Sequence, residues 1–95
     1  MDPKTPYMVT PDGEVTPFPP ANGKHYSLKE LQSAVGGYIE VYPMPAKRGQ
    51  PKRIVVMDEE GRLKGLPKNH LVSQAFGLDA LIVGTVIVCP SRMVR

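Results

Sequence analysis

Few side chains in this sequence combine the type and spacing that an active site requires. The two histidines, His25 and His70, form no HxH or HxxxH pair, so a zinc site would need them to meet through tertiary folding. The single cysteine, Cys89, ends an apolar run and is more typical of a buried hydrophobic residue than of a nucleophile. Three consecutive carboxylates at 58–60 offer the oxygen ligands that a divalent cation takes, but hairpin turns favour the same residues. We therefore expect no catalytic residue, no cofactor and no metal site.

The best candidate for binding an anion is the start of a short predicted helix. Lys68, Asn69 and His70 lie where free backbone N–H groups coincide with the positive end of the helix dipole. Asn69 is also an adequate N-cap residue, so ordinary capping explains the same pattern. The segment is therefore either an anion-binding site or a simple helix start.

A second candidate surface combines tyrosines with basic residues. Tyr38 and Tyr42 lie on one side of an alternating strand, and a basic loop follows this strand. Tyrosine suits protein interfaces, and aromatic rings also stack on nucleic-acid bases. Since aromatic residues make up only 6% of the chain and Trp is absent, we rank protein contact above nucleic-acid contact. The residues of this predicted contact surface are Tyr38, Tyr42, Lys47, Arg48, Lys52 and Arg53.

The composition indicates one small globular domain. The chain has 95 residues, is 41% hydrophobic and 22% charged, and carries a net charge of +3. Prolines crowd the first twenty residues and argue against a helix or a central strand there. No apolar run reaches the roughly 20 residues of a membrane helix, and the start lacks a signal-peptide pattern, so we expect a cytoplasmic protein. We divide the chain into a Pro-rich arm or edge hairpin at 1–26, an α+β domain at 27–90 and a loose tail at 91–95.

Two helices are predicted from local signals. Ser27 and Glu30 form a capping box ahead of an apolar face, which predicts a helix over 28–35 that ends at a Gly-Gly pair. A second, shorter helix is predicted over 70–76, with an asparagine before it and a glycine after it.

The strands follow from alternating and β-branched runs. Residues 38–42 alternate and predict a half-buried strand, and residues 53–66 predict a β-hairpin around an acidic turn. The apolar run at 81–88 predicts a central strand, in which Gly84 indicates a bulge or a close backbone approach. The predicted fold class is therefore α+β, with a mainly antiparallel sheet of about four strands, one main helix and one short helix.

Four short motifs follow one another as they do in a known family. They are Gly37-Tyr38-Ile39-Glu40-Val41, Asp58-Glu59-Glu60-Gly61-Arg62-Leu63, Leu66-Pro67-Lys68-Asn69 and Ile82-Val83-Gly84-Thr85-Val86. On these motifs, residues 27–88 resemble domain-of-unknown-function family number 3846, whose members are short proteins of phages, prophages, plasmids and their bacterial hosts. The resemblance implies a mobile-element accessory protein that works inside a bacterial host cell, and it carries over no catalytic residue. The Pro-rich start and the basic segment at 46–52 depart from the family pattern.

The small size, the resemblance and the lack of a catalytic constellation favour a binding protein over an enzyme. The first hypothesis is an accessory protein that binds a host protein stoichiometrically, for example to inhibit a component of an antiviral defence system. The alternative is a protein that binds or sequesters an anionic, nucleotide-like small molecule in a pocket completed by a homo-oligomer interface. A nucleic-acid-binding module ranks third, and its affinity would fall steeply with salt. No membrane partner is expected.

Overall fold

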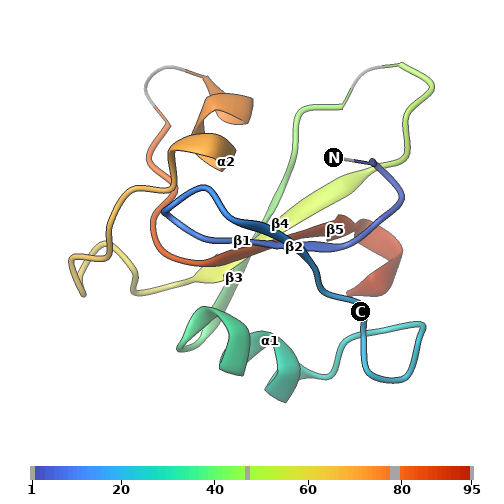
Figure 1. Ribbon diagram of the computed structural model, residues 1–95, viewed down its shortest axis with the longest axis horizontal. Coiled ribbons are helices and arrows are strands. Elements are labelled where there is room, and N and C mark those ends of the chain that lie inside the picture. The colour runs from blue at the N-terminus through green and yellow to red at the C-terminus, as the bar shows by residue number, and fades with distance from the viewer. Residues whose placement is uncertain (1, 47, 78–79, 95) are drawn as a thin grey trace.

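The computed structural model describes residues 2–46, 48–77 and 80–94. A five-stranded antiparallel sheet crosses the molecule in the order β2-β1-β5-β4-β3, with α1 on one face and α2 on the other (Figure 1). The predicted α+β class is confirmed, although the sheet has five strands instead of about four. The elements are β1 Tyr7–Val9, β2 Val15–Pro17, α1 Leu28–Val35, β3 Ile39–Pro43, β4 Arg53–Asp58, α2 His70–Phe76, β5 Val86–Pro90 and the 3-10 turn η1 Ser91–Met93.

The core has two layers, one on each face of the sheet. Side chains alternate along β4 and β5, so Val55 and Val88 pack with Val72 of α2, whereas Ile87 packs with Leu31 of α1. Burial of these apolar side chains on both faces is the main stabilising contribution. No helix in the described part of the chain is long and apolar enough to span a membrane.

Both helices have the bounds that their local signals predict. In α1, Ser27 Oγ accepts from Glu30 N (3.1 Å), and Ser27 N donates to Glu30 Oε2 (2.5 Å), which completes the capping box. Gly36 ends α1 with a φ of 91°, a conformation that glycine adopts without strain. In α2, Asn69 is the N-cap residue and accepts from Val72 N (3.3 Å).

The N-terminal segment forms a hairpin that belongs to the sheet. β2 is an edge strand, but β1 lies between β2 and β5, so the expectation that this stretch holds no central strand is wrong for residues 7–9. The three residues of β1 contain no proline, which is why the strand can pair on both sides. At the other end, η1 forms within the expected loose tail, and Met93 is buried with its carbonyl accepting from Tyr26 N (2.9 Å); Arg95 lies outside the described residues.

The predicted hairpin at 53–66 is wrong. β4 pairs with β3 and β5, and residues 58–66 instead fold back in successive turns, with Gly61 N donating to Asp58 O (3.1 Å) and Lys64 N to Glu60 O (3.0 Å). An ion pair between Asp58 Oδ2 and Lys64 Nζ (2.7 Å) joins the two ends of this segment. We call residues 58–66 the acidic turn.

The last strand begins later than its apolar run predicts. Residues 82 and 83 are buried, but Gly84 has a φ of 76°, which interrupts the extended backbone, and β5 starts at Val86. A Cβ atom on Gly84 would lie 2.8 Å from Leu66 Cδ1, so the predicted close approach is present. Val83 joins only an isolated bridge to Lys68.

Candidate functional site

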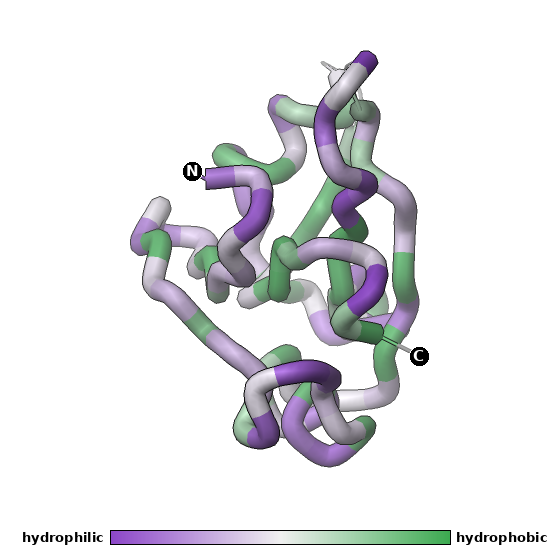
Figure 2. Tube along the Cα trace, turned by 90° about the vertical axis from the view of Figure 1, so that its right-hand side faces the viewer, coloured by the Kyte–Doolittle hydropathy of each residue, from purple (hydrophilic) through white to green (hydrophobic). Residues whose placement is uncertain are grey.

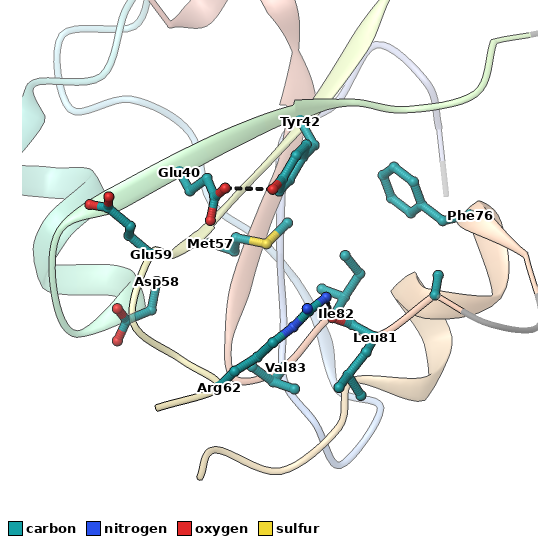
Figure 3. A pocket seen from close by; sticks show the side chains of 11 residues that line it. Glu40, Tyr42, Met57, Asp58, Glu59, Arg62, Phe76, Leu81, Ile82 and Val83 are labelled. Atoms are coloured by element: carbon teal, nitrogen blue, oxygen red, sulfur yellow. Dashed lines mark hydrogen bonds between the residues drawn. The ribbon is translucent and has the colours of Figure 1, made fainter. Parts of the chain in front are cut away.

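A cleft opens on the α2 side of the sheet, between β3, the acidic turn and the segment before β5 (Figure 3). Its volume is about 370 Å³. We call it the Arg62 cleft, after the side chain that crosses it in Figure 3. The residues that line it are Glu40, Tyr42, Met57, Asp58, Glu59, Arg62, Phe76, Ala80, Leu81, Ile82 and Val83.

The cleft has an apolar floor. Met57, Ile82 and Val83 are each less than a tenth exposed and belong to strands or segments of the core. Phe76, at the end of α2, is partly buried, and Leu81 is 42% exposed at the rim. An inserted apolar group would therefore meet side chains that the fold already holds in place.

Two hydrogen bonds involve polar side chains at the rim. Tyr42 Oη donates to Glu40 Oε1 (2.5 Å), and Arg62 Nη2 donates to Leu81 O (3.1 Å). The hydrogen bond to Glu40, followed by the charge of that carboxylate, raises the pKa of Tyr42 above its ordinary value, whereas Arg62 opposes this shift. The Arg62 guanidinium has further N–H donors beyond the one that Leu81 O receives.

The acidic turn, which carries Arg62, is closed by hydrogen bonds of Asp58 and Lys64. Asp58 Oδ1 accepts from Glu60 N (2.9 Å), while Lys64 Nζ donates to both Asp58 Oδ2 (2.7 Å) and Gly36 O (3.2 Å). The hydrogen bond from Lys64 is the main reason that the pKa of Asp58 lies below its ordinary value. These bonds join the turn to the end of α1.

The predicted contact surface is divided in the structure. Tyr42 lines the Arg62 cleft, but Tyr38, which is 67% exposed, borders a separate depression with Gln32, Gly37, Glu60 and Lys64. The loop between β3 and β4 begins at the other end of β3 from Tyr38 and is hydrophilic at the top of Figure 2. Arg48 and Lys52 are exposed there, Arg53 begins β4, and Lys47 lies outside the described residues.

The predicted anion-binding residues also have different environments. Lys68 and His70 border one pocket with Ser73 and Gln74. Asn69 is fully buried, and its Nδ2 donates to Val9 O and Gly84 O, both at 3.0 Å. Its Oδ1 caps α2, so the side chain of Asn69 is fully used in holding the fold together.

The groups considered for catalysis and metal binding are also placed by the structure. Cys89 is fully buried, and burial raises the pKa of its thiol to about 12, which disfavours the reactive thiolate. Within residues 2–46, 48–77 and 80–94, no three His, Cys, Asp or Glu side chains are close enough to hold a metal ion.

A comparison with known families finds a family model that matches the chain. A family model described as Domain of unknown function (DUF3846) matches residues 3–92. The chain belongs to the DUF3846 family. The match covers almost the whole DUF3846 chain, including the Pro-rich hairpin that lay outside the four motifs. No curated protein and no solved structure matches it.

The four motifs of the DUF3846 chain meet around the Arg62 cleft. The motifs at 37–41, 58–63 and 82–86 each contribute residues to its lining. The motif at 66–69 joins them through two backbone bonds, from Gly84 N to Pro67 O (2.8 Å) and from Asn69 N to Ile82 O (2.7 Å). The segments that carry the family resemblance therefore build one continuous region of the molecule.

Proposed function

We propose that this DUF3846 protein is a stoichiometric protein-binding module, not an enzyme, and that the Arg62 cleft is the centre of its contact surface. The proposal includes the role that the family resemblance implies, an accessory protein of a phage or other mobile element that binds a protein of its bacterial host. The observation that supports this proposal is the combination, in one cleft, of an apolar floor with the exposed side chains of Tyr42, Leu81 and Arg62 around its rim.

This combination matches the chemistry of protein interfaces. Tyrosine and arginine are enriched among the residues that contribute most binding energy, and such residues surround pockets that an anchor side chain fills. A volume of about 370 Å³ lies at the small end of the range for small-molecule sites. The cleft is therefore better suited to one or two side chains of a partner than to a large ligand.

The rim also indicates what the anchor carries. An apolar or aromatic side chain would contact Met57, Ile82 and Phe76, while a neighbouring carbonyl or carboxylate of the partner would accept from Arg62. A basic group of the partner would lie near Glu40 and Glu59, which line the same cleft. The partner would thus be recognised by an apolar anchor with polar groups on both sides.

A matched pair of leucines tests this proposal. Leu81→Glu places a charge at the cleft rim, whereas Leu28→Glu places the same charge on α1, across the sheet; these leucines are 42% and 58% exposed. Tagged wild type and both variants are expressed in a bacterial host, and captured proteins are quantified by mass spectrometry. We expect a partner captured in near-equal amount by the wild type and by Leu28→Glu, and at least about tenfold less by Leu81→Glu, a loss of about 1.4 kcal/mol. Equal capture by all three proteins would refute the cleft as the contact site.

A further inference from the structure

The outer edge of β3 has unpaired backbone groups. Tyr38 O accepts from Glu59 N (2.8 Å) and Arg53 O accepts from Met44 N (2.9 Å), so residues 38 and 44 direct their peptide groups towards β4. In an antiparallel ladder this direction alternates from residue to residue. The N–H and C=O groups of Ile39 and Val41 therefore point away from the sheet, and no described residue pairs with them.

The opposite edge of the sheet is less open. Phe18 N donates to Pro6 O (3.0 Å), so residue 18 directs its peptide groups towards β1. Because this direction alternates along the strand, the peptide groups of Val15 and Pro17 in β2 point outwards. Pro17 has no N–H, and proline on an edge strand discourages pairing with another strand. β3 keeps two complete donor–acceptor residues, and its only proline, Pro43, is the last residue of the strand.

We propose that β3 of one copy pairs with β3 of a second copy, antiparallel and about a two-fold axis at Val41. Residue 41 then lies opposite residue 41 of the second copy, and residue 39 lies opposite residue 43. The missing donor of Pro43 removes one bond on each side, which leaves about four backbone hydrogen bonds across the axis. Val41 is 40% exposed in the single chain, and the pairing covers it with its own counterpart.

The charges at the two ends of β3 are complementary, which favours a second copy of the chain as the partner that pairs with the β3 edge. The N-terminal end of β3 lies beside the acidic turn, where Glu59 and Glu60 are exposed; of the two basic residues in this turn, Lys64 is paired with Asp58 and Arg62 donates to Leu81 O. The C-terminal end of β3 leads into the loop with Arg48 and Lys52, which are also exposed. Antiparallel pairing directs the basic loop of each copy towards the acidic turn of the other, twice per dimer. A parallel arrangement would bring like charges together. Exposed charge pairs contribute little affinity, so they set the orientation of the dimer more than its strength.

The dimer would place both Arg62 clefts on the same side of one continuous ten-stranded sheet, because a two-fold axis normal to the sheet keeps each α2 on the same face. Binding of a partner with two sites would then gain from effective concentration. The pairing itself does not depend on the proposed function of the cleft.

Charge substitutions at Val41 test the register. The Val41 side chain faces the α1 side, opposite Val56 of β4, and its peptide groups make no bond to β4. Val41→Lys and Val41→Glu each place like charges opposite each other at the axis. We expect the full-length wild type to sediment as a concentration-dependent dimer, each variant to be a monomer with an unchanged circular dichroism spectrum, and an equimolar mixture of the two variants to form a heterodimer.

Proline provides a second test that does not depend on charge. Val41→Pro removes an outward donor without removing a β3–β4 bond, and Val15→Pro makes the matched change on the β2 edge. We expect Val41→Pro to abolish the dimer and Val15→Pro to retain it. A monomeric wild type, a dimer that persists in Val41→Lys, or a mixture that fails to form the heterodimer would overturn the inference. Loss of captured host protein in Val41→Lys with a monomeric wild type would instead assign the edge to a strand of the partner. We expect Leu81→Glu to leave the dimer unchanged. The proposal for the Arg62 cleft and the proposal for the β3 edge can therefore be refuted independently of each other.

Discussion

Replacement of Asn69 by alanine is the strongest test of how this fold is held together. The Asn69 side chain is fully buried and links three separate segments, since Nδ2 donates to Val9 O in β1 and to Gly84 O before β5, while Oδ1 caps α2. Alanine leaves two carbonyls and one N–H without their partner. A buried polar group left unpaired costs about 1–3 kcal/mol, and a lost N-cap costs about 0.5–2 kcal/mol.

These contributions are not fully additive, because water can enter the space that the amide leaves. We expect Asn69→Ala to lower the free energy of unfolding by about 3–4 kcal/mol, a large share of the 5–15 kcal/mol typical of a domain. The melting temperature should fall by at least about 12 °C. Urea unfolding followed by circular dichroism measures the change. A variant within about 1 kcal/mol of the wild type would refute the view that Asn69 joins these segments.

Asn69→Asp tests the helix-capping role of the Asn69 side chain separately from its role as a hydrogen-bond donor. The aspartate keeps an acceptor for Val72 N, but at neutral pH its second oxygen would face two carbonyl oxygens, so it should destabilise as much as alanine. Burial would raise the folded pKa of this carboxyl above its unfolded value of about 3.9. Its destabilising effect is therefore present above the folded pKa and shrinks as the pH falls, because the protonated acid can donate to one carbonyl. A constant difference from the wild type between neutral and acidic pH would contradict this account.

Two further variants test the supports of the Arg62 cleft. Asp58→Asn should lower the free energy of unfolding by about 1–2 kcal/mol at neutral pH. Because the hydrogen bond from Lys64 lowers the folded pKa of Asp58, this contribution is present above the unfolded pKa of about 3.9 and is lost as the pH falls through the lower folded pKa. Thermal melts across the acid range should therefore converge for the two proteins, and parallel curves would refute the ion pair. Gly84→Ala should destabilise by more than Gly13→Ala, since both glycines have a positive φ but only Gly84 has side-chain atoms within 4 Å of a new Cβ. Equal losses in urea unfolding would show that only backbone strain matters at Gly84.

The helices were predictable because their signals are local. Ser27 and Glu30 satisfy each other's backbone within one turn, so the start of α1 depends on no distant residue. The cap at Asn69 is also local, but its donor function is not. Its Nδ2 reaches Val9, sixty residues away in sequence, and no pattern around Asn69 indicates that contact.

Strand pairing is less predictable, because it depends on contacts between residues that are far apart in the sequence. Residues 53–57 have the composition of a buried strand, but alternation cannot show which strands lie beside it. The pattern of the next residues predicts a returning partner strand, whereas Asp58 and Lys64 close them into a turn. The sequence indicates a close approach at Gly84, but no local signal identifies the approaching residue, Leu66.

Only part of the candidate site could be predicted. The alternating strand pattern beside a basic segment indicates Tyr42 as a surface residue, and Tyr42 lines the cleft. The sequence predicts strands at both Arg62 and Leu81, and no local pattern relates the two residues. They meet through a hydrogen bond between residues nineteen positions apart, where the acidic turn lies beside the segment before β5. A site assembled from separate segments leaves no spacing signal in the sequence.

The alternation of β3 explains how one strand can serve both proposed surfaces. Glu40 and Tyr42 direct their side chains into the Arg62 cleft and their peptide groups towards β4. Ile39 and Val41 direct their peptide groups outwards and their side chains towards α1. A side-chain change in the cleft therefore leaves the outward donors in place, and a change at Val41 leaves the cleft lining in place. If both proposals hold, Val41→Lys should keep the affinity for a single-site partner and weaken only the binding of a partner that engages two clefts at once.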